Sequence, residues 1–307
     1  MPLRMRARLS GCLGFALCVL AAASTSALAA GTAVPPDGPD LSAMTLTSSD
    51  FTSGGAASGG RWTTTGSLPT YIAQNGKGRI GSTSVMLTMN LLLAQADAVG
   101  AAGDIAITRR ALSTPAGRAA FVKAFVKLPS IGGEKMTVVV GAPQVIAAGD
   151  EAFQFTLTYV IGKTREPALA EFVRVDRVEG FVLAKASAGG KSLPRAVGKA
   201  EALALAARMR AGLAVGVSAA PTISGSPQLG QTLSADHGHW TGGPSAFGYQ
   251  WNRCDVAGAN CTAIAGATQT SYVPGTADSG GTLTVTVTGS NTVGQMSSSS
   301  TPTALVS

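Results

Sequence analysis

The sequence is poor in the side chains that most enzymes use for catalysis at neutral pH. Its 307 residues include two histidines and four cysteines, and residues 31–236 contain neither type. Most pairs of a nucleophile with an imidazole, and most zinc sites, require one or both of these residue types. We therefore predict no catalytic, metal-binding or cofactor-binding residue in the long middle of the chain, and no cofactor for the protein.

Charged residues are also scarce, and they are spread thinly. They make up 13% of the chain, and the formal net charge is +7. The first eight residues contribute three arginines, residues 219–307 hold one arginine against three aspartates, and residues 31–218 carry 19 Lys and Arg against 13 Asp and Glu. Binding to the phosphates of nucleic acid favours a clustered basic patch, which this sequence lacks. We predict no nucleic-acid partner.

Long apolar runs are missing after residue 30, so we predict no membrane span in the mature chain, because a span takes about 20 residues. The first thirty residues are typical of a secretory signal peptide. Three arginines come first, an apolar run covers 12–23, and Ala27-Leu28-Ala29 fits a cleavage site. We expect residues 1–29 to be removed, taking Cys12 and Cys18 with them, and the mature protein to be secreted or held at the cell surface.

Changes in composition divide the mature chain into two domains. Residues 30–60 are rich in Gly, Pro and Ser and are expected to form a flexible lead-in that can include a short helix. Residues 61–213 are expected to form an α+β domain, residues 214–220 a linker, and residues 221–307 an all-β domain.

The strands of the α+β domain are predicted from period-two alternation. Phe153, Phe155, Leu157 and Tyr159 alternate with polar residues, as a strand with one buried face does. Further strands are expected at 104–109 and 135–140, and a hairpin at 172–175 and 181–186. Residues 85–93 also alternate, although their unbranched side chains leave a helix open there.

Two helices are expected in this domain. Thr114 can cap the first and Pro115 can occupy its first position. The second covers 194–213, where Gly198 should weaken it by about 1 kcal/mol relative to Ala. Its apolar positions are Val197, Leu203 and Leu205, and its polar positions are Lys199, Glu201, Arg208 and Arg210. We predict an antiparallel sheet with these helices on one face and a Thr- and Gln-rich face open to water.

Three groups of polar residues in this domain could form a site, and each has a simpler interpretation. Asp150 and Glu151 are neighbours, so on a strand they point to opposite faces, and a solvated turn is the better interpretation than shared acid–base work. Residues 74–79 contain glycine and basic residues but lack the spacing of a phosphate-binding loop. The arginines at 109, 110, 174 and 177 fit surface charges better than an anion clamp.

Residues 221–307 show short strands at regular spacing, separated by turns rich in Gly, Pro and Asn, which is typical of a β-sandwich. The strands are expected at 222–224, 231–235, 246–254, 261–264, 271–273, 282–290 and 295–304. In the sixth, Leu283, Val285 and Val287 alternate with threonines, the pattern of a half-buried strand.

This segment closely resembles the bacterial immunoglobulin-like repeats of secreted and cell-surface proteins. The resemblance covers nearly all of 221–307. It rests on 221–233, Tyr249-Gln250-Trp251-Asn252-Arg253-Cys254, Asn260-Cys261-Thr262-Ala263-Ile264, Ala277-Asp278 and 282–285. It implies an immunoglobulin-like sandwich in which Trp251 anchors the core and Cys254 and Cys261 form a local disulfide. Such a disulfide belongs outside the reducing cytosol. Residues 40–213 carry no motif specific enough to name a family.

His237 and His239 are the histidines of this segment. On a strand, positions i and i+2 share a face, which would allow two metal ligands. Because no third ligand lies nearby in the sequence, an exposed turn is the better interpretation.

These features together predict an exported, non-catalytic protein in which the immunoglobulin-like module has an interaction or spacer role. The expected partner is a cell-envelope component or another secreted protein. One alternative is a sensor or small-ligand-binding protein that uses the α+β domain. A second alternative is a hydrolase with an unrecognised carboxylate site, since Asp, Lys or Ser can also serve in catalysis.

Overall fold

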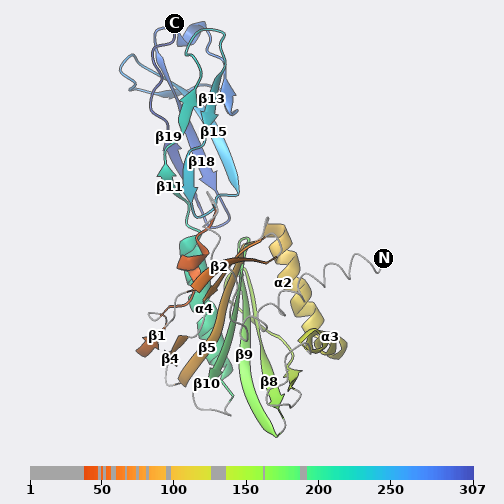
Figure 1. Cartoon of the computed structure of the whole chain (residues 1–307). Coiled ribbons are helices and arrows are strands. Elements are labelled where there is room, and N and C mark those ends of the chain that lie inside the picture. Colours follow the sequence, from red (N-terminus) through yellow and green to blue (C-terminus); the bar gives the residue numbers. More distant parts are fainter. Residues whose placement is uncertain are drawn as a thin grey trace. The chain divides into compact units, whose positions relative to one another are not determined.

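The computed structural model describes residues 38–47, 50, 53–56, 60–65, 68–73, 76–80, 83–94, 98–125, 136–161, 163–186 and 192–307. The expected signal peptide and its cleavage site lie outside these residues. The chain divides into two compact units, with Leu41–Gly212 in the first and Leu213–Ser307 in the second (Figure 1). Residues 38–40 group with the second unit.

The first unit is built on one ten-stranded antiparallel sheet. Its strands are β1 (Ser53–Ala56), β2 (Gly60–Thr65), β3 (Leu68–Ala73), β4 (Gly76–Ile80), β5 (Thr83–Ala94), β6 (Met136–Val140), β7 (Gln144–Ile146), β8 (Glu151–Ile161), β9 (Thr164–Val175) and β10 (Val178–Ala186). The main path runs β1-β4-β5-β10-β9-β8-β6, β3 pairs with β5 and β2, and β7 pairs with β8. The predicted hairpin is present as β9 and β10, and residues 85–93 form a strand rather than a helix.

The helices described in this unit are η1 (Leu41–Met44, a 3-10 helix), α2 (Ala98–Leu112), α3 (Pro115–Phe125) and α4 (Arg195–Gly212). The predicted cap of α3 is confirmed, because the Gly117 N–H donates to Thr114 Oγ1 at 3.0 Å. The bounds of α4 agree with the predicted 194–213 to within one residue at each end.

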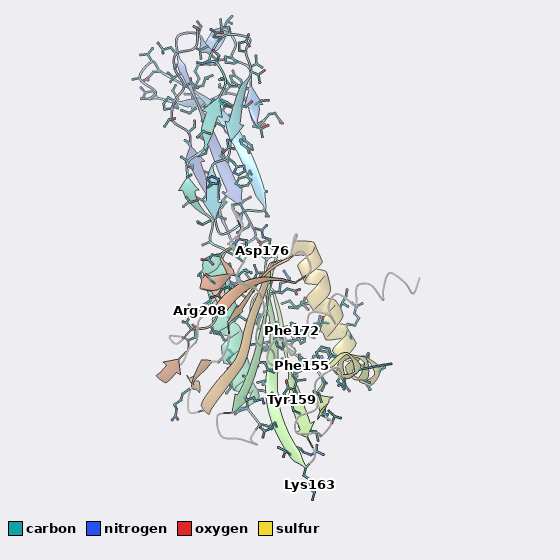
Figure 2. The ribbon with its side chains drawn as sticks, in the orientation of Figure 1. Phe155, Tyr159, Lys163, Phe172, Asp176 and Arg208 are labelled. Atoms are coloured by element: carbon teal, nitrogen blue, oxygen red, sulfur yellow. A yellow bond between two sulfur atoms is a disulfide. The ribbon has the colours of Figure 1, made fainter. Side chains whose placement is uncertain are left out.

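One face of the sheet packs against α2 and α3. The core there contains Phe153, Phe155, Leu157 and Tyr159 of β8, Phe172 of β9, Phe181 of β10, Ile105 and Leu112 of α2, and Phe121 of α3. The rings of Phe155 and Phe121 meet edge to face, with centroids 5.9 Å apart. Figure 2 shows Phe155 and Phe172 on neighbouring strands on this side of the sheet. The face that the alternation of β8 predicted to be buried is therefore the α2–α3 face.

The opposite face of the same sheet is covered by α4, so the prediction of helices on one face is wrong. Phe172 packs toward α2 and α3, whereas its neighbour Glu171 approaches Gly198 of α4. The reason lies in β9, where residues 168–173 are buried without a break. A strand that is covered on both faces is mostly apolar along its length, as residues 168–173 are apart from Glu171. This burial of β9 on both faces decides how the helices are placed, more than the polar alternation of β8 does.

Other local predictions in this unit also need correction. Residues 104–109 lie in α2 rather than in a strand. Ile105 and Ile107 favour a strand, but the Ala-rich residues around them continue the helix. Part of the lead-in belongs to the unit, since β1 pairs with β4. Arg208 of α4 also donates to Asp50 at 2.5 Å and to Thr47 at 2.6 Å.

The second unit has three small antiparallel sheets. They are β11 (Gly216–Ala219) with β14 (His239–Thr241); β12 (Thr222–Ser224), β13 (Leu233–Asp236) and β17 (Ser271–Tyr272); and β16 (Thr262–Ala263), β15 (Ala246–Cys254), β18 (Thr282–Ser290) and β19 (Gln295–Ser299). One core takes Leu233, Trp240, Trp251, Leu283, Val285 and Val287 from all three sheets. Trp251 is fully buried, and its ring N–H donates to the Gln269 carbonyl at 2.9 Å.

Residues 214–220 form part of this second unit instead of a linker. Gly216 and Val217 of β11 pair with Thr241 and Trp240 of β14. Val215 and Val217 also pack against the core. The short, small and apolar sequence that suggested a linker is that of a strand, and the unit begins at Leu213.

Within the described residues, no helix combines the length and the apolar character that crossing a membrane requires.

Candidate functional site

The neighbouring carboxylates of Asp150 and Glu151 are drawn apart by different arginines. Glu151 opens β8 and pairs with Arg109 of α2 at 3.0 Å. Asp150, in the turn before β8, pairs with Arg174 of β9 at 3.4 Å and with Arg210 of α4 at 3.2 Å. The two carboxylates therefore do not form an acid–base pair, and this absence was predicted from their adjacency. Both are ion-paired, however, and not simply solvated as the predicted turn implied.

Asp150 also holds the β9–β10 turn. Its Oδ2 accepts the backbone N–H of Asp176 at 2.6 Å, and its own N–H donates to the Arg174 carbonyl at 2.8 Å. Asp176 has a φ of 52°, a left-handed conformation that Asp adopts more readily than most residues. Figure 2 shows Asp176 and Lys163 at opposite ends of β9. These contacts make Asp150 a structural corner between two turns and α4.

A cleft of about 510 Å³ lies beside this corner, lined by Arg109 and residues 145–152. Its volume is in the range of small-molecule sites. Val145 is 71% exposed there and gives the cleft an apolar wall. Arg109 and Glu151, which both line the cleft, pair with each other.

A second acidic group, which the sequence did not single out, lies between the sheet and α4. It consists of Gln154 of β8, Glu171 of β9 and Glu201 of α4, which are 7%, 0% and 1% exposed. Gln154 and Glu171 are directly opposite each other on neighbouring strands. Within the described residues, Gln154 Oε1 and all four carboxylate oxygens are buried without a hydrogen-bond partner. We call these three residues the buried acidic cluster.

Burial changes the acidity of both carboxyl groups in the cluster. Removal from water raises the pKa of Glu171 well above its ordinary value, and repulsion from Glu201 raises it further. Burial also raises the pKa of Glu201 to about 8. Because an unpaired buried charge is costly, the cluster must hold protons or be matched by positive charge.

Gly198 allows the α4 backbone to approach this cluster. A Cβ atom at Gly198 would lie 2.4 Å from Glu171 Oε1, 2.6 Å from Gln154 Oε1 and 2.6 Å from Leu169 Cδ2. Glu201 follows three residues later and shares this helix face. The predicted polar face of α4 is therefore wrong at Glu201, which is buried, and the predicted apolar face is wrong at Leu203, which is 45% exposed. A glutamate inside the apolar run of β9, and a glycine one turn before a glutamate in α4, were the available signals.

The two histidines do not form a pair of ligands. His237 stacks on Phe247 with ring centroids 4.4 Å apart, whereas His239 is exposed on β14. Gly238 between them has a φ of 77°, so the chain is not extended there and the rule for positions i and i+2 does not apply. No group of three or more His, Cys, Asp or Glu side chains in the described part of the chain is arranged to hold a metal ion.

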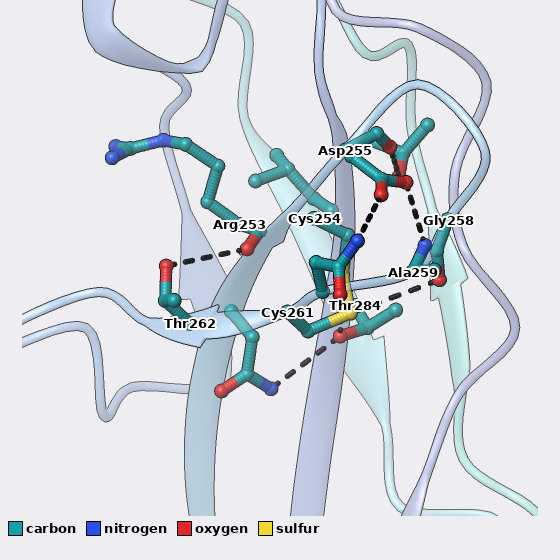
Figure 3. The surroundings of a disulfide bond; sticks show 12 residues. Arg253, Cys254, Asp255, Gly258, Ala259, Cys261, Thr262 and Thr284 are labelled. Carbon is teal, nitrogen blue, oxygen red and sulfur yellow. Dashed lines mark hydrogen bonds between the residues drawn. A yellow bond between two sulfur atoms is a disulfide. The ribbon is translucent and has the colours of Figure 1, made fainter.

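A disulfide joins Cys254 and Cys261 across the loop between β15 and β16 (Figure 3). Asp255 organises this loop, because its Oδ1 accepts the N–H groups of Ala257 and Ala259 at 2.9 and 2.8 Å. The Ala259 N–H is the main reason why the pKa of Asp255 is lowered. The structure thus contains the cysteine pairing that the resemblance implied.

Exposed apolar side chains gather at the end of the second unit that carries the C-terminus. They are Leu229, Val256, Val273 and Leu305, which are 39%, 71%, 50% and 51% exposed. Hydrogen bonds connect the segments of Leu229, Val273 and Leu305: Leu229 N–H to the Ser307 carbonyl and Gly230 N–H to the Pro274 carbonyl. The Val256 segment is connected through the start of β18, because Thr282 Oγ1 donates to the Asp255 carbonyl and the Val306 N–H donates to the Gly281 carbonyl. We call these four residues the C-terminal pole.

Residues 76–79 of the basic, glycine-containing stretch lie in β4, and residues 74–75 lie outside the described part of the chain. No family model, curated protein or solved structure matches this chain significantly.

Proposed function

We propose that this chain is an exported, non-catalytic protein of the cell surface or the extracellular space, and that its second unit is an immunoglobulin-like module with an interaction or spacer role. The observation that carries the proposal is the Cys254–Cys261 disulfide. Cys254 is the last residue of β15, the strand that contains the buried Trp251. Structural disulfides persist in oxidising compartments, in agreement with the signal peptide predicted for residues 1–29. Small sheets around one core, with loops at the ends, support a sandwich.

The partner we propose is a cell-envelope component or another secreted protein, and the contact surface is the C-terminal pole. Its four apolar side chains come from separate loops that hydrogen bonds hold at one end of the unit. Exposed apolar groups that gather in this way mark interaction surfaces more often than scattered ones do. The same disulfide that closes the 255–260 loop fixes the backbone that presents Val256.

Export is tested by producing the full chain, leader included, in a host with an intact secretion pathway. Intact-mass measurement without reduction should find a species that begins near Ala30 and has no free thiol. A stable main product that begins at Met1, or one with both mature thiols free, would contradict the proposal.

Binding is tested by sedimenting the mature protein with an envelope fraction of the producing strain. The wild-type protein should sediment, and the variant L229S/V273S/L305S should remain in solution because the apolar contact is lost. M296S is the matched control, since Met296 is an exposed apolar residue of β19, outside the pole. Equal sedimentation of the triple variant would remove the pole from the proposal. Hydrolytic turnover abolished by one carboxylate substitution would overturn the non-catalytic role.

The cleft beside Arg109 supports a second candidate, a small-ligand-binding role for the first unit. Native mass spectrometry of protein purified from the secreting host should then detect a bound small molecule. V145E should abolish this adduct without unfolding the unit, because Val145 lines the cleft and is largely exposed. Identical spectra for wild type and V145E would contradict this candidate.

A further inference from the structure

The buried acidic cluster consists of hydrogen-bond acceptors that lack donors. Gln154 offers its amide oxygen, and Glu171 and Glu201 offer two carboxylate oxygens each. No Lys, Arg, His or backbone N–H of the described residues donates to these five atoms. Buried polar atoms in folded proteins nearly always have partners, so this arrangement indicates a missing positively charged species.

The three side chains come from three different elements, and all three are buried between the sheet and α4. Gln154 and Glu171 face each other across β8 and β9. The Oε1 atoms of both residues lie within 2.6 Å of the position that a Gly198 Cβ would occupy. Glu201 is buried and follows Gly198 by three positions, so it lies on the same face of α4. The absence of a side chain at Gly198 leaves these oxygens facing the helix backbone with no methyl group between them.

The amide oxygen is an observation independent of the two carboxylates. The side chain of Gln154 is only 7% exposed. Its unpartnered amide oxygen lies, like Glu171 Oε1, beside the position that a Gly198 Cβ would occupy. Protons on the carboxyl groups could supply at most two donors to five acceptor atoms. A cation can be shared among all five.

We propose that Gln154, Glu171 and Glu201 bind a calcium ion between the sheet and α4. Calcium takes about 6–8 oxygen ligands and accepts carboxylates in bidentate mode, so two such glutamates and one amide oxygen supply most of its shell. The set contains no nitrogen or sulfur donor, which disfavours zinc and copper. Magnesium demands a near-ideal octahedron and keeps several of its waters, an arrangement that two bidentate carboxylates do not fit. Two negative charges match one divalent cation.

The site would join β8, β9 and α4, so calcium should stabilise the first unit. This inference does not depend on the proposed role of the second unit.

The test uses the mature protein, stripped with EDTA and dialysed at pH 8. Calcium chloride is added in isothermal titration calorimetry, and the melting of the first unit is followed by its helical circular dichroism. We expect one calcium per chain and a melting temperature that rises with calcium concentration. An equimolar magnesium titration should give a response at least tenfold weaker, and sodium chloride of equal ionic strength should give none.

The variant E171Q/E201Q should lose both the heat of binding and the calcium-dependent shift. E151Q is the matched control and should keep both, because Glu151 pairs with Arg109 outside the cluster. If the double variant does not fold, Q154L provides a variant with both charges kept, in which calcium affinity should fall at least tenfold. No calcium response of the wild type up to about 10 mM, beyond the range of weak extracellular sites, would overturn the proposal. So would an equal response to magnesium, or a response that E171Q/E201Q retains.

Discussion

Replacing Gly198 with alanine tests the packing of α4 on the sheet, because the helix alone and the structure predict opposite signs. In an exposed helix interior, Gly to Ala should stabilise by about 1 kcal/mol. Here the added Cβ would lie 2.4 Å from Glu171 Oε1, and 2.6 Å from Gln154 Oε1 and from Leu169 Cδ2. Atoms this close must move. All three side chains are buried, so none can swing into water.

The size of the effect follows from the cost of overpacking the core and the gain in helix propensity. Overpacking of a core costs about 1–3 kcal/mol, and we take the upper end because three neighbours must shift together. After subtracting the gain in helix propensity, G198A should destabilise the first unit by about 2 kcal/mol. For a unit of this size, that corresponds to a melting temperature lower by about 4–8 °C.

The assay is thermal and urea unfolding in EDTA, followed by helical circular dichroism. The α-helices of the described residues all lie in the first unit, so this signal reports on that unit. A207G is the matched control, since Ala207 is exposed on the same helix and should lose only about 1 kcal/mol of propensity. In a Q154A background the cost of G198A should shrink, because one of the three contacts is gone. A G198A protein as stable as the wild type would refute the close approach of α4.

Three other predictions follow from contacts described above. C254S/C261S should destabilise the second unit by about 2–3 kcal/mol, the chain-entropy value for a loop of about eight residues, and urea unfolding followed by tryptophan fluorescence measures this; an unchanged midpoint would contradict it. The raised pKa of Glu201, about 8 against an ordinary 4.5, means that the folded state holds the proton more tightly. In EDTA, the stability of the first unit should therefore fall as the pH rises from about 4.5 to about 8, and E201Q should flatten this slope in a series of unfolding curves. A fragment of residues 213–307 should melt cooperatively and above a fragment of residues 221–307, because only the longer one contains β11 and its pairing with β14; equal melting temperatures would show that β11 contributes nothing.

Local pattern was sufficient for many elements of the fold. The β9–β10 hairpin, the Thr114 cap and the alternation of β18 are features of neighbouring residues, and each was visible in the sequence. The second face of the sheet was not predicted, because its cover depends on how β9 packs and not on how β8 alternates. β9 is buried throughout 168–173, and weighing that run above the polar residues of β8 would have placed a helix on each side.

The buried acidic cluster could not be predicted by spacing alone. Glu171 and Glu201 are thirty positions apart and belong to a strand and a helix, so only tertiary packing brings them together. Helix periodicity assigned Glu201 to the polar side of α4, where a charged residue normally lies. Gly198 changes that assignment, because it lets the helix approach the sheet so closely that the residue one turn later is buried with it.

The hold of α4 on the start of the first unit has a consequence for the order in which the unit can assemble. Arg208 binds Asp50 and Thr47, which precede it by 158 and 161 positions, and α4 is the last element of the unit along the chain. A chain that emerges from its N-terminus cannot close this contact until nearly the whole unit has appeared. Until then the sheet face with Glu171 and Gln154 has no helix over it, and the start of the unit lacks its anchor. Contacts of such long sequence separation slow folding, so completion of the first unit should wait on α4 even when the hairpins of its sheet form early.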